Sequence, residues 1–257
     1  MPTNPTNQTD PILTRLLENL PSGWRVSQLY LGPTFTASFI ENTDGERRIG
    51  LAVLPGGVPS EVGFLQPGFN RLDLPEASAF SQHALNSERV KVSAGLATLN
   101  ALLQPDPTLL SPIDAGDWLV EEGRDRQVAL VGRFPFIDEL EQVVRKLWVF
   151  ELEPQPGEYG FRQAPEIIPQ AAILAVTGSS LLNHSLHDYL ALANPNAKVI
   201  VLGPSTPLSP LMFEFGVHVL SGVLVEDEKA LLDSIAKGLS FRRMKGTKRV
   251  SLVRPGL

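Results

Sequence analysis

The chain has 257 residues, and its 22 lysines and arginines against 28 aspartates and glutamates leave a net charge of −6. This acidic balance argues against a protein that binds nucleic acid by neutralising phosphates, because such proteins usually carry a basic surplus. The lack of cysteine excludes disulfides, zinc–thiolate sites, iron–sulfur clusters and thiol nucleophiles.

The longest uninterrupted apolar run, around residues 171–176, is far shorter than the roughly 20 residues that a membrane-spanning helix needs. The first residues have neither the positive charge nor the apolar core of a signal peptide. We therefore expect a cytoplasmic protein that binds neither membranes nor nucleic acid. Whether it forms a homo-oligomer stays open.

The first part of the chain predicts a small α+β domain over residues 10–108. Residues 1–9 are polar and predict a disordered leader. Asp10 followed by Pro11 is typical of a helix start. The aspartate side chain can accept N–H groups of the first turn, and proline lacks only a backbone N–H that would have no partner at this position. Strand-like runs follow at 24–31, 34–41 and 48–54, with helical segments at 76–85 and 87–103. The sequence Asn42-Thr43-Asp44-Gly45 predicts an antiparallel hairpin between the second and third strands.

From about residue 115 the pattern changes to short apolar strands alternating with helices. The predicted strands cover 127–132, 146–151, 172–178, 198–203 and 216–221, and the predicted helices cover 137–144, 180–192, 207–214 and 227–237. This alternation is typical of a doubly wound parallel sheet with both faces covered. Residues 115–257 therefore predict a Rossmann-like α/β domain, and residues 249–253 fit an additional edge strand.

Ligands of such sheets bind beyond the carboxyl ends of the strands, where two loops here combine glycine with small hydroxyl residues. The first is Thr177-Gly178-Ser179-Ser180 and the second is Gly203-Pro204-Ser205-Thr206. Each hydroxyl could cap a helix or bind a ligand oxygen. If the two strands are neighbours, the loops should face each other across a shared, anion-friendly crevice, with Asn183 in the first turn of its helix.

Glu151 ends a predicted strand whose preceding residues are apolar. A carboxylate at this position could bind ribose-like hydroxyls or act as a general base, and a solvated loop carboxylate is the alternative. His184 and His187 lie three residues apart on a predicted helix and could begin a metal site, although a solvated helix face explains them more simply. Asn100 could be a buried amide that ties the two domains together.

The usual dinucleotide, phosphate-loop and serine-hydrolase motifs do not occur in the chain. The strings VTGSSLLN (176–183) and VLGPSTPLSP (201–210) instead resemble the putative heavy-metal chelation family. The V-G-x-F-P segment at 131–135, the strand ending in Glu151, the helix at 95–101 and Gly50-Leu51-Ala52 extend this resemblance over nearly the whole chain. The loop at 156–160 departs from the family pattern, which puts a carboxylate role for that loop in doubt.

The resemblance implies a Rossmann-like C-terminal domain and a companion domain with the fold of the enolase N-terminal domain, with the site in the cleft between them. It also implies a role in handling or making metal-chelating small molecules of pterin, flavin or siderophore type. Since the chain has no thiols and few histidines, an organic chelator is the better carrier for a metal.

We therefore expect a protein that binds, and could chemically modify, such a molecule or its metal chelate. The alternatives are a non-catalytic chelate-binding protein and an enzyme that uses S-adenosylmethionine or NAD through a degenerate fingerprint. The sequence does not identify a cofactor, and it leaves open whether the protein is an enzyme. Glu151 is the catalytic candidate, and the ligand-binding candidates are Gly132, Phe134, Thr177, Gly178, Ser179, Ser180, Asn183, Gly203, Pro204, Ser205 and Thr206.

Overall fold

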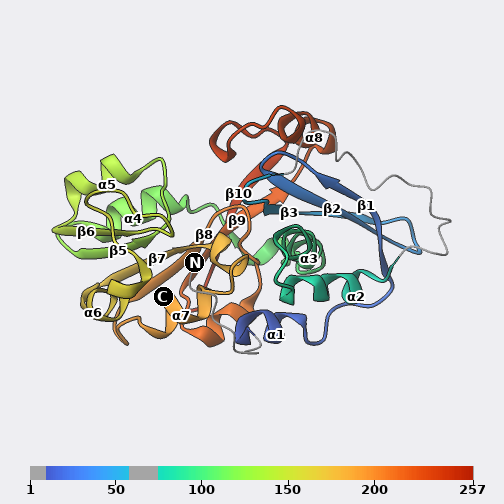
Figure 1. The fold of residues 1–257 in the computed structure, drawn as a ribbon. Helices are drawn as coiled ribbons and strands as arrows, with labels where there is room; N and C mark the ends of the chain where they lie inside the picture. The colour runs from blue at the N-terminus through green and yellow to red at the C-terminus, as the bar shows by residue number, and fades with distance from the viewer. Residues whose placement is uncertain (1–9, 58–74, 257) are drawn as a thin grey trace.

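A computed structural model of the chain describes residues 10–57 and 75–256, so the predicted leader at 1–9 lies outside the described residues. Within them the strands form two sheets (Figure 1). The smaller is antiparallel, in the order β1 (Trp24–Leu31), β2 (Phe35–Asn42), β3 (Arg47–Val53). The larger has seven strands in the order β4-β10-β9-β8-β7-β5-β6. Its strands are β4 (Leu110–Ser111), β5 (Gln127–Val131), β6 (Lys146–Phe150), β7 (Ile173–Thr177), β8 (Lys198–Leu202), β9 (Val219–Val225) and β10 (Thr247–Val253).

The α-helices are α1 (Pro11–Leu17), α2 (Ala77–Ser81), α3 (Arg89–Leu102), α4 (Ala115–Gly123), α5 (Ile137–Val143), α6 (Ala164–Ile167), α7 (Leu186–Ala191) and α8 (Glu228–Ala236). The 3-10 turns are η2 (Gln82–Leu85), η3 (Pro107–Leu109), η4 (Phe161–Gln163), η5 (Ile168–Gln170), η6 (Gly178–Leu181), η7 (Pro210–Phe215) and η8 (Phe241–Arg243). Helix α1 begins as predicted, because the Asp10 carboxylate accepts the N–H groups of Ile12 and Leu13 at 3.0 Å.

The small sheet is covered on both faces, by α3 on one side and α8 on the other (Figure 1). Helix α3 packs so closely on β3 that a Cβ atom on Gly50 would lie 2.0 Å from the carbonyl oxygen of Ala97. On the opposite face, Phe39 belongs to a buried apolar cluster with Leu231 and Ile235 of α8. A helix from the C-terminal half thus completes the core of the N-terminal sheet. The division into domains at residues 108–115 stays a prediction.

The large sheet has the parallel core that the alternating pattern predicts. Strands β6, β5, β7, β8 and β9 pair in parallel, and their buried positions carry almost only apolar side chains. Numbered along the chain, these five strands have the order 2-1-3-4-5. Strand β10 pairs antiparallel with β9 and also with β4, so it is not the edge strand that residues 249–253 suggested.

Three predicted elements differ from the structure for local reasons. The helix expected at 180–192 is interrupted, because His184 adopts a left-handed φ of 59° between η6 and α7. The helix expected at 207–214 is the 3-10 turn η7, which starts at Pro210. The strand expected at 216–221 begins only at Val219, since Gly216, with φ 81°, ends η7.

A candidate small-molecule cleft at the switch point

The chain passes from β5 to β6 on one side and then crosses to β7 on the other, so the winding direction reverses between β5 and β7. In open parallel sheets, ligands bind beyond the carboxyl ends of the strands at such a switch point. A cleft of ≈ 270 Å³ lies there. It is lined by residues that directly follow these three strands, among them Gly132, Glu151 and Ser179.

Glycine is required at position 132 because the backbone there has φ 105°. A Cβ atom would also lie 3.2 Å from the Cβ of Thr177, so glycine lets the two loops approach. Thr177 caps η6, since its hydroxyl accepts the N–H of Ser179 at 3.3 Å and donates to the Ser179 hydroxyl at 3.2 Å. Ser180, which is buried, lines the cleft beside them. The first hydroxyl loop therefore forms one wall of the cleft.

Glu151 and Tyr189 bring the polar groups of the opposite wall. Glu151 is half-buried, and Tyr189 is buried with its ring 6.5 Å from that of Phe150. Burial, together with the charges of Glu151 and Asp188, raises the pKa of Tyr189 to about 12, so its phenol is protonated at neutral pH. Among the described residues, no group hydrogen-bonds the Glu151 carboxylate or the Tyr189 phenol oxygen.

Arg133 stands at the same cleft, but its guanidinium is held by another carboxylate. It forms a two-pronged bond with Glu158, with Nε–Oε1 at 2.8 Å and Nη2–Oε2 at 2.6 Å. These bonds raise the pKa of Arg133 and, with a further bond from the N–H of Gln155, lower the pKa of Glu158. The loop that departs from the family pattern thus supplies a partner for Arg133, a pairing that the sequence alone did not indicate.

The second hydroxyl loop lies beside the first, because β7 and β8 are adjacent and pair Thr177 with Leu202. The two loops touch rather than enclose a crevice, since a Cβ on Gly178 would lie 2.5 Å from the Thr206 hydroxyl oxygen. Gly203, Pro204, Ser205 and Thr206 are not among the residues that line the switch-point cleft. Pro204, Ser205 and Thr206 lie instead at the junction with the small sheet, whereas a Cβ on Gly203 would meet Thr177 of the first loop at 3.8 Å.

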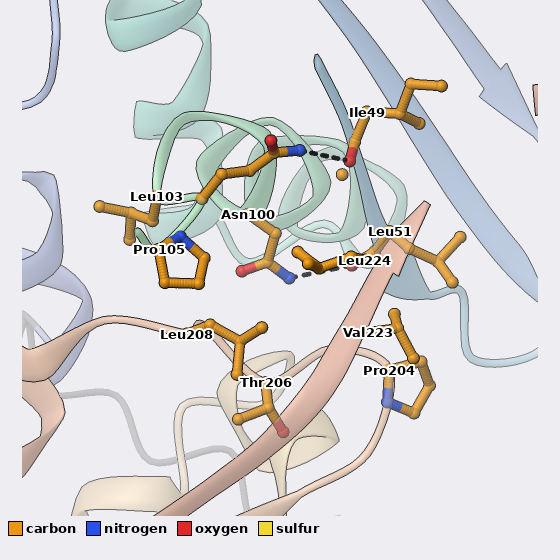
Figure 2. A pocket seen from close by; sticks show the side chains of 12 residues that line it. Ile49, Leu51, Asn100, Leu103, Pro105, Pro204, Thr206, Leu208, Val223 and Leu224 are labelled. Atoms are coloured by element: carbon orange, nitrogen blue, oxygen red, sulfur yellow. Dashed lines mark hydrogen bonds between the residues drawn. The ribbon is translucent and has the colours of Figure 1, made fainter. Parts of the chain in front are cut away.

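There, the Ser205 hydroxyl accepts the backbone N–H of Val53 at 2.9 Å. The Asn100 side chain donates to the carbonyl oxygens of Leu51 at 2.9 Å and Ser205 at 3.3 Å, so it connects the two sheets as expected. A cavity of only ≈ 10 Å³ remains at this junction (Figure 2). Its lining includes Asn100 and Thr206, whose side-chain oxygens are buried and unpaired within the described chain.

Of the remaining candidates, Phe134 lies outside the cleft and Asn183 lines it. Phe134 stacks on Phe136 at 5.3 Å and packs with the core around α4 and α5. Asn183 lies between η6 and α7, where it accepts the Ser185 hydroxyl at 2.7 Å while lining the cleft. No α-helix starts at Ser180, since η6 is a short 3-10 turn and α7 begins at Leu186. The helix ends that would have made the crevice favourable for anions are therefore missing from both loops.

The two histidines of the predicted helix have separate surroundings. His184 lies with Nδ1 3.3 Å from the Asp10 carboxylate and Nε2 2.9 Å from the carbonyl oxygen of Asn86. His187 lies edge-on to Phe215. Across the described residues, no group of three or more histidine, cysteine, aspartate or glutamate side chains is placed to hold a metal ion. Nor is any described helix long and apolar enough to cross a bilayer.

The family model described as putative heavy-metal chelation (DUF364) matches residues 114–254, more than half of the chain. The chain belongs to this family. An uncharacterised protein of Methanocaldococcus jannaschii is 27% identical over 175 residues, which cover 63% of this chain and 67% of that protein. Crystal structures of two family members of unknown function share the fold. The one from Desulfitobacterium hafniense has a TM-score of 0.78 at 22% identity and covers 96% of this chain and 99% of its own. The one from Pyrococcus horikoshii has a TM-score of 0.76 at 21% identity and covers 95% of this chain and 100% of its own.

The family description implies a heavy metal, and the donor set at the cleft does not fit one held by side chains alone. Hydroxyls, one unpaired carboxylate, a phenol and the Asn183 amide line the cleft, together with an arginine that is already paired. Soft and borderline metals prefer thiolate and imidazole ligands, and neither is present among the lining residues. Any metal at this cleft would need donors from another molecule.

Proposed function

We propose that the protein binds a metal-chelating small molecule in the switch-point cleft, and that the molecule rather than the protein supplies the metal ligands. Membership of the family supports the link to chelation. The observation that carries the proposal is the unpaired Glu151 carboxylate, which faces a cleft whose other wall is lined by hydroxyls. Such polar groups suit a molecule rich in oxygen donors and hydroxyls, which is the chemistry of most organic chelators.

A chemical step on this molecule would use Glu151 as a general base, since a carboxylate without a protein partner is free to accept a proton from a bound ligand. Tyr189 would stay protonated and donate a hydrogen bond. A second candidate, a nucleoside cofactor, is supported by one observation. Glu151 lies 19 residues after Gly132 and directly follows β6, the strand next to the first parallel strand, where dinucleotide-binding sheets place a ribose-binding acid.

The proposal is tested by titration calorimetry at pH 7 with a catechol chelator, the same chelator loaded with gallium(III), gallium(III) in a weak buffer complex, S-adenosylmethionine and NAD. We expect the free chelator to bind at one site, the loaded chelator to bind more weakly because gallium(III) already occupies both catecholate oxygens, and the metal source alone to give no heat above dilution. Ser179→Trp, which would fill the cleft, should abolish this binding, whereas the exposed control Ser22→Trp should not. Binding of the metal alone, or unchanged binding by Ser179→Trp, would overturn the proposal. Saturable binding of a nucleotide only would favour the second candidate.

A further inference from the structure

We propose that Glu151 is the receptor for a vicinal diol carried by a planar, ring-bearing ligand. This inference rests on the proposed occupancy of the switch-point cleft and names the chemical class of its ligand. Two hydroxyls on adjacent carbons can each donate to one oxygen of a carboxylate, and an ionised carboxylate offers acceptors only. Hydrogen bonds of this kind are stronger than those between neutral groups, so the diol would be the anchoring group.

Arg133 is the cation next to Glu151, but it pairs with Glu158 and leaves the Glu151 carboxylate without a partner among the described residues. Arg133 is close enough for the Glu151 charge to act on it, yet both prongs of its guanidinium are on Glu158. Glu158 is itself fixed by the N–H of Gln155 at 2.7 Å and is largely buried, with 17% of its side chain exposed. The Arg133–Glu158 pair is therefore neutral as a unit. An unpaired negative charge remains on Glu151 in the cleft.

This charge selects against anionic groups at this end of the cleft. A phosphate or carboxylate beside Glu151 would meet a like charge, whereas neutral hydroxyls would gain an acceptor. The Tyr189 phenol lies in the same lining and is protonated at neutral pH, so it can donate to a ligand oxygen or accept from a hydroxyl. The polar side of the cleft thus matches a neutral diol better than it matches a free anion.

The apolar side is marked by exposed hydrophobic side chains. In the described chain, Leu152 is 75% exposed and Phe161 is 43% exposed, two of only four large hydrophobic side chains left this open. Leu152 lines the cleft next to Glu151, and the Phe161 ring stands edge-on to Tyr189 at 5.1 Å. An apolar ring above these side chains would bury surface that the protein alone leaves in water.

Catechols and ribonucleosides are two kinds of ligand that carry a vicinal diol with a flat ring. In a catechol the diol is on the ring, and in a ribonucleoside it is on the attached sugar. Matched pairs separate them. Catechol is compared with its 1,3-isomer resorcinol, and adenosine is compared with 2′-deoxyadenosine. We expect the vicinal member of the responding pair to bind about tenfold or more tightly than its partner, the effect of a hydrogen bond to a charged group.

Variants identify the receptor. Glu151→Gln keeps the side-chain shape and removes the charge, so it should weaken diol binding about tenfold or more. The exposed control Glu166→Gln should leave binding unchanged. Glu158→Gln should also weaken binding although Glu151 is intact, because the released Arg133 can then pair with Glu151. Adding Arg133→Gln to Glu158→Gln should restore the diol affinity, because no cation is then left to pair with Glu151. Melting temperatures verify that each variant is folded.

The outcomes distinguish this inference from the proposed function. Equal binding of both members of the responding pair, whether catechol and resorcinol or adenosine and its deoxy analogue, overturns the inference while leaving the cleft as a binding site. Wild-type affinity in Glu151→Gln overturns it as well. A chelator that binds only through its metal or carboxylate, with no diol dependence, supports the proposed function and rejects the diol receptor. If Ser179→Trp binds as well as the wild type, both proposals fail.

Discussion

The backbone N–H of Val53 donates to the Ser205 hydroxyl at 2.9 Å, and this bond joins the open edge of the small sheet directly to the loop after β8. The rest of that edge is closed by side chains of α3 and of Gln104, which follows it. Ser93, Asn100 and Gln104 donate to the carbonyl oxygens of Val53, Leu51 and Ile49, respectively, at 2.9, 2.9 and 3.3 Å. Alternate residues of an edge strand are thus satisfied by polar side chains, which prevents pairing with another chain.

Ser205→Ala should therefore act on stability rather than on ligand affinity. Removal of the hydroxyl leaves the Val53 N–H buried without an acceptor, which costs about 1–3 kcal/mol. Ser205 is fully buried and does not line the cleft. Urea unfolding should show this loss, whereas the exposed control Ser22→Ala should stay within about 0.5 kcal/mol of the wild type. A tenfold loss of ligand affinity without destabilisation would contradict this role.

Gly178→Ala should disrupt the contact between the two hydroxyl loops. Its Cβ would lie 2.5 Å from the Thr206 hydroxyl oxygen, 2.7 Å from the Thr206 nitrogen and 2.9 Å from its Cα, and backbone atoms cannot easily move aside. Overpacking of this kind costs typically about 1–3 kcal/mol. Thermal unfolding should register this loss together with weaker ligand binding, because the cleft wall at 177–180 would shift. Gly160→Ala is the control, since its Cβ meets nothing closer than 3.6 Å. Equal melting temperatures for both variants would contradict the prediction.

His184 should make stability fall as pH rises from mildly acidic to alkaline values. Both ring nitrogens face acceptors, the Asp10 carboxylate and the Asn86 carbonyl, and only the doubly protonated ring donates to both. The bond to Asp10 is the main reason that the His184 pKa is raised above its ordinary value of 6.5, against the opposing effect of burial. A group whose pKa is raised by folding stabilises the folded protein fully when the pH is below its pKa in the unfolded state. This stabilisation is lost as the pH rises through its pKa in the folded state.

The measurement is the free energy of unfolding of the wild type and His184→Asn between pH 5 and 9. Asparagine tolerates the left-handed backbone at this position. We expect the wild-type advantage to be greatest below pH 6.5 and to shrink as the folded-state ring deprotonates. A constant difference over the whole range, or one that grows with pH, would show that the ring is not held as a cation.

The sequence predicted elements whose signals are local and missed relationships that depend on packing. The α1 start at Asp10, the hairpin turn at 42–45 and the alternating strands were readable because capping, turn chemistry and hydrophobic period act within a few residues. The interruption of the helix at His184 was not predictable from the sequence. The His184 ring contacts Asp10 and Asn86, which are each about 100 or more residues away along the chain.

The candidate site was predictable to a similar extent. The glycine–hydroxyl loops and Glu151 were found because they directly follow strands of a parallel sheet. Which loop faces the cleft depends on strand order, and a sequence that alternates strand and helix does not specify where the winding reverses. Tyr189 went unnoticed because it lies inside a helix rather than in a loop after a strand, and the Arg133–Glu158 pair because 25 residues separate its members. Ser205 resembled a ligand-binding residue, yet its partner is a backbone group of β3.

The small cavity between the sheets should hold one ordered water. Its volume of ≈ 10 Å³ is about what one water needs, and the unpaired oxygens of Asn100 and Thr206 are among its polar lining (Figure 2). A crystal structure at high resolution should show a water within hydrogen-bond distance of both. Thr206→Val, which keeps the shape, should lower the water's occupancy and destabilise the protein by about 1 kcal/mol. An empty cavity, or a more stable variant, would refute the assignment.

Helix α8 should make the two sheets unfold together. Leu231 and Ile235 are fully buried and cluster with Phe39 of the small sheet, although α8 directly follows β9 of the large one. Leu231→Ala should cost about 2–5 kcal/mol, as for other large-to-small core changes. Single-tryptophan variants provide the measurement, because Trp24 reports on the small sheet and Trp148 on the large one. Both signals should follow one urea transition, and Leu231→Ala should shift both equally. Two separate transitions, with only that of Trp24 moved by Leu231→Ala, would instead mean that the predicted domains at 10–108 and 115–257 fold independently.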